Sequence, residues 1–249
     1  MNNFSRINNI IGWIIFLIAS LVYIITSEPT ASFWDCGEYI ATAYKLQVGH
    51  PPGAPLFQML GRFFSLFAFG DTSLVARMIN TMSALSSSFT ILFLYWSIVM
   101  LGRKMYEKAA AMSQSQSFAV LGAGLIGALA YTFSDSFWFS AVEGEVYAMS
   151  SFFTAIVFWA ILKWERVAEQ KHADRWLILI AYLMGLSIGV HLLNLLAIPA
   201  ITLVYYYKRF KPNRKGAFIA FGVSIVILSA VMYGIIPEVV QLFATTELL

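Results

Sequence analysis

The chain has 249 residues, of which 59% are hydrophobic and only 12% are charged, and its mean hydropathy is +0.74. This composition excludes an ordinary soluble domain and indicates a membrane protein with several crossings. The formal net charge of +3 is small and gives no reason to expect a nucleic-acid partner.

Apolar stretches follow one another along the chain, and a helix needs about 20 such residues to cross a bilayer. They lie near residues 10–26, 77–101, 118–133, 146–162, 176–207 and 217–236. The stretch at 176–207 is too long for one crossing, so we expect a hairpin of two short helices there. The sequence thus predicts an all-α, polytopic transmembrane helix bundle of about seven crossings. We expect one domain over residues 1–249, which could be the N-terminal part of a longer protein.

Lysine and arginine residues orient these helices, because cytoplasmic loops retain them. Basic residues gather at Arg6, at 103–108 including Lys108, at 163–175 and at 208–215, and most acids lie in the loops between these segments. We therefore expect the N-terminus inside. The loops around residues 27–76 and 134–145 and the hairpin tip near 189–194 are predicted to lie outside.

The first outer loop contains the stretch FWDCGEYIATAYKLQVGHPPGAP, residues 33–55. Ser32 and Asp35 have the spacing of a capping box and predict a short helix. On that helix Asp35, Glu38 and Tyr39 share one face.

Two interpretations of Asp35 stay open at this point. It could simply cap the helix, or its ionised carboxylate could accept a proton from a substrate hydroxyl. Capping does not account for Glu38, because two carboxylates one turn apart repel unless a cation or a proton lies between them. We expect Glu38, if desolvated, to titrate upward or to bind a cation.

The run His50-Pro51-Pro52-Gly53 follows this helix. Each proline fixes its own φ and disfavours helix in the preceding residue, so the backbone should aim the imidazole of His50. A turn alone would need the prolines but not the histidine, which favours a role for His50 in a site.

Two later segments at the outer side add candidates. Glu143 and Glu145 precede a helix, where one of them could be only a cap, but with Tyr147 they could line a sugar or acceptor pocket. His191 and Asn194 lie three residues apart at the predicted hairpin tip. Polar residues at that depth are either helix-to-helix contacts or members of a site.

The quoted stretch, together with SAVEGEVYAMS (140–150) and GVHLLNLL (189–196), resembles the GT-C superfamily of multi-pass glycosyltransferases. Within it the chain is similar to the bacterial relatives of the animal transmembrane protein O-mannosyltransferase that modifies plexins. The resemblance implies an inverting transfer of mannose or another hexose from a polyprenyl-phosphate donor to Ser or Thr hydroxyls of exported proteins. It also implies a bacterial inner-membrane protein with its active site facing the periplasm.

The resemblance maps the acidic catalytic residue onto Asp35, with Glu38 beside it, and the loop histidine onto His50. Such a displacement also needs positive charge for the departing phosphate. The candidates at the outer side are Arg62, Arg77 and Lys45, although basic residues near helix ends are also common as lipid anchors.

We expect no cofactor. No glycine-rich phosphate loop follows a strand, and the resembling O-mannosyltransferases imply no metal, although Asp35, Glu38 and His50 could supply ligands to a divalent cation. Two other functions stay open: a secondary transporter or lipid flippase, whose usual repeat symmetry is not visible, and a non-catalytic membrane subunit.

Overall fold

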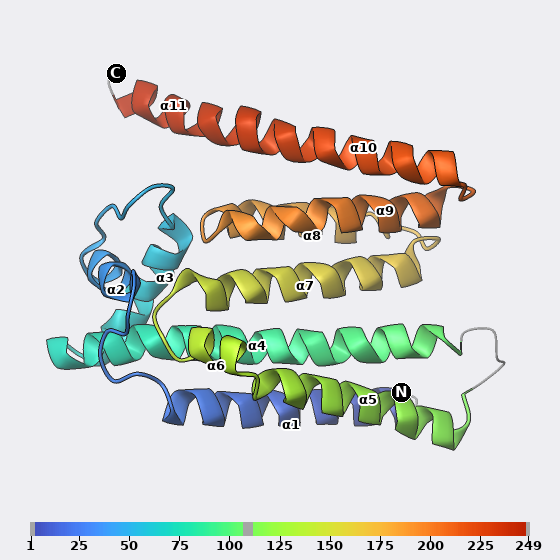
Figure 1. Ribbon diagram of the computed structural model, residues 1–249, viewed down its shortest axis with the longest axis horizontal. Helices are drawn as coiled ribbons and strands as arrows, with labels where there is room; N and C mark the ends of the chain where they lie inside the picture. The colour runs from blue at the N-terminus through green and yellow to red at the C-terminus, as the bar shows by residue number, and fades with distance from the viewer. Residues whose placement is uncertain (1–2, 107–111, 248–249) are drawn as a thin grey trace.

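The computed structural model describes residues 3–106 and 112–247, and every regular element within them is helical. Lys108 lies outside the described residues. The longer helices lie side by side in a bundle, and those that follow one another along the chain run in opposite directions (Figure 1), which confirms the predicted all-α class. The main helices are α1 Asn3–Ile25, α2 Cys36–Lys45, α3 Pro55–Ser65, α4 Val75–Lys104, α5 Gln114–Thr132, α6 Asp135–Ala141, α7 Val146–Val167, α8 Arg175–Ile188, α9 Ala197–Arg209, α10 Arg214–Ala230 and α11 Ile236–Glu247.

Five helical segments of the described chain are long and apolar enough to cross a membrane. They are α1, α4 with the short turn η2 (Thr72–Leu74) before it, α5, α7, and α10 continued by α11. The last segment extends beyond the predicted 217–236, because a π turn at Val231–Ile235 continues the helix and Pro237 falls in the first turn of α11, where proline is tolerated.

The predicted hairpin at 176–207 is confirmed. The chain reverses between α8 and α9 through the short helix η3, Leu192–Leu196. Both arms are short, with 14 and 13 residues, and both pack against α7. The backbone N–H of Leu56 donates to the carbonyl of Gly189 at 2.7 Å, so the hairpin tip is tied to the start of α3.

The charges separate to the two ends of the bundle. One end, which we call the acidic end, carries the loop with α2 and α3, the short helix α6 and the hairpin tip (Figure 1). The opposite, basic end carries the last turns of α4, α7 and α9, with Arg103, Lys104, Arg166, Lys208 and Arg209. This arrangement agrees with the alternation of charge in the sequence, and a cytoplasmic location of the basic end stays a prediction.

Helices α4 and α7 occupy the centre of the bundle: α4 packs against α1, α5 and α7, and α7 packs against α8 and α9. Close packing also joins α2 to α3, since a Cβ atom on Gly61 would come within 2.9 Å of the Cβ of Ala43. Small residues permit such approach between helices in a membrane protein. The α2–α3 pair is thereby held as one unit over the acidic end.

The capping box predicted at Ser32 and Asp35 is wrong. Helix α2 begins at Cys36, and the Asp35 side chain makes no cap hydrogen bond. Trp34 has a φ of 58°, which no helix starting at Ser32 could contain. The helix nevertheless continues to Lys45, close to the predicted end.

Candidate functional site

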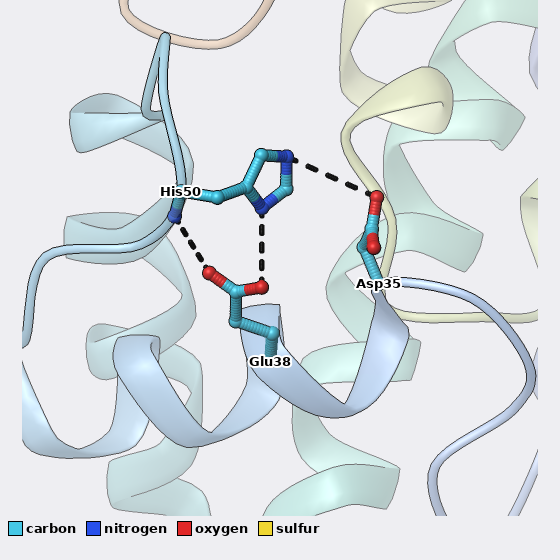
Figure 2. Close-up of side chains that lie close together, drawn as sticks. All are labelled: Asp35, Glu38 and His50. Atoms are coloured by element: carbon cyan, nitrogen blue, oxygen red, sulfur yellow. Dashed lines mark hydrogen bonds and ion pairs between the residues drawn. The ribbon is translucent and has the colours of Figure 1, made fainter.

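Asp35, Glu38 and His50 lie together at the acidic end (Figure 2). The backbone N–H of His50 donates to Oε1 of Glu38 at 2.6 Å, and Nδ1 of the same histidine lies 3.1 Å from Oε2 of Glu38. On the other side of the ring, Nε2 lies 3.9 Å from Oδ2 of Asp35. An ionised carboxylate only accepts hydrogen bonds, so Nδ1 carries the proton toward Glu38 and Nε2 faces Asp35.

Local sequence explains how the imidazole reaches this place. The turn from His50 to Gly53 is closed by a hydrogen bond from the Gly53 N–H to the His50 carbonyl, at 2.9 Å. Gly53 has a φ of 78°, a conformation that favours glycine. This turn fits the expectation that the His-Pro-Pro-Gly run fixes the direction of the imidazole, and the direction observed is toward the two carboxylates.

A cavity of about 160 Å³ opens beside these residues. Three loops that are distant in the sequence contribute to it. Its polar lining residues are Asp35, Tyr39, His50, Glu145, Tyr147 and His191. The volume is below the roughly 300–1,000 Å³ of sites for drug-sized ligands, so it suits a single small group such as one sugar ring.

Glu145 is the buried acid of the cavity. It stands at the N-cap of α7 with extended backbone, and its side chain is only 5% exposed. Burial, together with the negative charge of Glu143, raises the pKa of Glu145 to about 7. Near neutral pH this carboxyl group can therefore hold a proton or release it.

Glu38 is not desolvated as the first expectation for it required, and its pKa moves down rather than up; binding of a cation by Glu38 stays a prediction. Hydrogen bonds from the backbone and then from the ring of His50 lower the pKa of Glu38, and its side chain is 40% exposed. Sequence spacing could show that the two carboxylates are close, but not that His50 would take both oxygens of Glu38. Among the acids that line the cavity, the one with a raised pKa is Glu145.

Tyr39 lines the same cavity, although its sequence position alone did not predict a function for it. Its ring centroid lies 5.9 Å from that of His50, and it packs edge-on against the buried Phe57 at 5.4 Å. Burial, with the negative charge of Glu145, raises the pKa of Tyr39 to about 12. Its position on the same helix face as Asp35 was the feature that could have identified it.

The structure separates the two polar residues of the hairpin tip. His191 lines the cavity next to Tyr147, with ring centroids 5.5 Å apart, and its Nδ1 accepts a hydrogen bond from the Leu193 N–H at 3.1 Å. Burial lowers the pKa of His191, so the neutral ring presents an Nε2–H donor. Asn194 is instead buried and donates to the Ser187 hydroxyl at 2.8 Å, outside the cavity.

Glu143 also lies outside the cavity. Its side chain is 4% exposed, and Oε2 has no hydrogen-bond partner among the described residues. Burial raises the pKa of Glu143, and a hydrogen bond with Ser32 opposes that shift. Its position behind the first loop fits a contribution to the negative field at Glu145 more directly than contact with a substrate.

The structure does not bring Arg62, Arg77 and Lys45 to the cavity. The Arg62 guanidinium donates to the carbonyl of Tyr44 at 2.9 Å and lies 5.2 Å from the centre of the Tyr44 ring. A cation at the end of α2 interacts favourably with the helix dipole. Lys45 and Arg77 are exposed. Binding of the donor phosphate by these three residues stays a prediction.

One ligand atom each from Asp35, Glu38 and His50 can be chosen so that all lie within 4.8 Å of one another. Such a spacing could suit a metal ion, but both oxygens of Glu38 already contact His50. In this arrangement Glu38 and His50 are partners of one another, and Nε2 of His50 lies on the Asp35 side.

A family model described as the protein O-mannosyl-transferase TMEM260 N-terminal domain matches residues 35–214. The chain is also similar to the protein O-mannosyl-transferase tmem260 of Dictyostelium discoideum, with 30% identity over 186 residues that cover 73% of this chain and 21% of that protein. The protein O-mannosyl-transferase TMEM260 of Mus musculus is 26% identical over 175 residues, which cover 70% of this chain and 22% of the mouse protein.

This chain thus spans about a fifth of the length of these relatives. No solved structure matches it. The matched range contains all three loops that form the cavity and most of the bundle around them. The chain is an integral membrane protein and belongs to the family of the TMEM260 O-mannosyl-transferase N-terminal domain.

Proposed function

We propose that the chain transfers a sugar, mannose or another hexose, from a polyprenyl-phosphate donor to Ser or Thr hydroxyls of exported proteins. The observation that carries this proposal is the convergence of Asp35, an oriented His50 and the buried Glu145 around one cavity. The relatives named above are O-mannosyl-transferases, which supports the same reaction class.

In the proposed step, the acceptor oxygen attacks the anomeric carbon of the bound sugar from the side opposite the phosphate, so the configuration inverts. The hydroxyl proton passes to the Asp35 carboxylate. The bond between the anomeric carbon and the phosphate oxygen breaks, and polyprenyl phosphate leaves with the bonding electrons. Asp35 suits the role of base because its side chain makes no cap hydrogen bond and lies at the cavity.

His50 supports this base. Glu38 fixes the Nδ1 proton, as a carboxylate does for many functional histidines, and the free Nε2 lies on the Asp35 side. Nε2 can therefore take up the proton from Asp35 after the transfer. It can also accept a hydrogen bond from the Asp35 carboxyl group while that group holds the proton. Glu38 acts through His50 and is a positioning residue in this account.

The departing phosphate needs hydrogen-bond donors. His191 lines the cavity and has an Nε2–H that can donate, and Glu145, with its pKa of about 7, can supply a second donor near neutral pH. A protonated Glu145 would also avoid repelling the phosphate. The Tyr147 ring beside His191 offers a flat apolar face to the sugar.

The acidic end would lie at the outer face of the membrane, which in bacteria is the periplasmic face. The reason is that the opposite end carries Lys and Arg residues, which are enriched in cytoplasmic loops. A donor with its lipid tail in the bilayer then reaches the cavity from the side. The acceptor segment enters from the water-facing loops.

Mass spectrometry of exported proteins tests this function. Cells with the chain should carry a hexose on Ser or Thr residues that cells without it lack, and the mass increment is restored by the wild-type gene. Flux of a lipid-linked sugar across liposomes without any covalent product would instead favour a flippase.

A further inference from the structure

A second cavity, of about 260 Å³, lies between α1, α4 and α7. Its lining residues lie in the first half of α1 and the C-terminal parts of α4 and α7, and the last turns of α4 and α7 are at the basic end of the bundle (Figure 1). None of its lining residues belongs to the proposed reaction. The proposed reaction therefore does not account for this cavity.

Tryptophan rings form one wall of this cavity. The centroid of Trp96 lies 6.2 Å from that of Trp13 and 5.9 Å from that of Trp159. Tryptophan is enriched where a membrane helix meets the headgroup region, since its ring is apolar and its N–H is polar. The wall thus suits the boundary between a lipid headgroup and its chains.

Three cations converge on the same cavity, namely Arg103, Lys163 and Arg166. The Lys163 ammonium lies 5.1 Å from the centre of the Trp159 ring, and the charges of Arg103 and Arg166 both act on it. No carboxylate is among the described residues that line the cavity. The described lining therefore combines three basic side chains with tryptophan rings in one concave site, and Arg103 also lies over the ring of Phe4.

Other basic residues at this end of the bundle do not line the cavity. Lys104, one position after Arg103, forms an ion pair with Glu165. Lys211 and Lys215 lie exposed near the start of α10, where they also add to the excess of positive charge at the basic end. Orientation of the protein in the membrane does not require cations in a tryptophan-lined cavity.

We propose that this cavity binds the phosphate of an anionic membrane lipid. A guanidinium group can contact phosphate oxygens in pairs, and an ammonium adds a point charge. Basic pockets between transmembrane helices are suited to lipid headgroups. The tryptophan wall would then lie against the glycerol and the first methylenes of the chains.

The test uses the full chain, purified in a non-ionic detergent and titrated with phosphatidylglycerol or phosphatidylcholine, with bound lipid followed by native mass spectrometry. We expect preferential retention of phosphatidylglycerol. The double variant Lys163→Gln/Arg166→Gln should weaken that retention about tenfold or more, whereas the matched variant Lys211→Gln/Lys215→Gln should retain the wild-type affinity. Equal binding of the two lipids, or unchanged binding in the Lys163/Arg166 variant, would overturn the proposal.

Two further measurements locate the ligand. Inorganic phosphate should not displace the lipid at equal concentration, and full displacement would assign the site to free phosphate. Brominated phosphatidylglycerol should quench wild-type tryptophan fluorescence more than brominated phosphatidylcholine does. That difference should shrink in Trp13→Phe/Trp159→Phe, which keeps all three cations, and an unchanged difference would place the lipid elsewhere.

Discussion

Glu38 holds His50 by two contacts at once, one to its backbone N–H at 2.6 Å and one at its ring Nδ1 at 3.1 Å (Figure 2). The first contact fixes where the turn after α2 returns to that helix. The second fixes the tautomer of the ring. One side chain thus sets both the position and the proton arrangement of the histidine that faces Asp35.

Replacing Glu38 with Gln should lower the transfer rate about 10–100-fold, the usual effect of losing a carboxylate that orients a functional histidine. The pH profile of the rate should also shift, because the amide no longer fixes the proton on Nδ1. Donor KM should change little, since Glu38 does not line the cavity.

The matched control is Glu28→Gln, which removes an exposed acid of the same loop that does not line the cavity. It should retain the wild-type rate. A Glu38→Gln variant with both the wild-type rate and the wild-type pH profile would remove Glu38 as a positioning residue.

Glu145 predicts a pH dependence of stability. Its pKa is raised to about 7 in the folded chain from an ordinary value of 4.5, so between these values the folded state binds more protons than the unfolded state. By linkage, the contribution of Glu145 to the free energy of unfolding is fully present below about pH 4.5 and is lost as the pH rises through about 7. The wild-type melting temperature in detergent should therefore drop by several degrees across this window.

The Glu145→Gln variant should have a flatter profile over the same window, because the amide does not ionise. The lowered pKa of Glu38 acts at more acidic pH, where its stabilisation is lost as the pH falls, so the two effects separate. A variant profile as steep as that of the wild type would show that Glu145 is not the titrating group.

Arg62 gives a prediction that separates stability from donor binding. Its guanidinium caps the carbonyl of Tyr44, so Arg62→Ala should lower stability by about 1 kcal/mol without changing donor KM in the folded fraction. Lys211→Ala, which removes an exposed lysine near the start of α10, is the comparison and should change neither quantity. A raised donor KM at unchanged stability would instead restore Arg62 as a phosphate ligand.

Much of the fold could be predicted because membrane helices follow from local composition. Apolar runs of about 20 residues mark the long helices, and basic segments on both sides of residues 176–207 required the hairpin formed by α8 and α9. The end of the last helix could not be found in this way, since the apolar run continues past a proline that the first turn of α11 accommodates.

The site could be predicted only in part, for a physical reason. Motif spacing identified Asp35, His50, Glu145, Tyr147 and His191, which the structure brings to one cavity. Which polar side chains face a cavity and which face the bundle interior depends on packing between distant helices. Asn194 and Glu143 fall on the interior side, and Arg62 is drawn to the end of α2 by the close contact between α2 and α3.

The most direct test of the central claim measures transfer of labelled mannose from polyprenyl-phosphate mannose to a Ser/Thr peptide, with Asp35→Asn compared with the wild type. The amide keeps the shape of the side chain but cannot take the hydroxyl proton, so the rate should fall at least 100-fold, while insertion and melting temperature stay at the wild-type level. A folded Asp35→Asn protein that transfers mannose at the wild-type rate would contradict the assignment of Asp35 as the base.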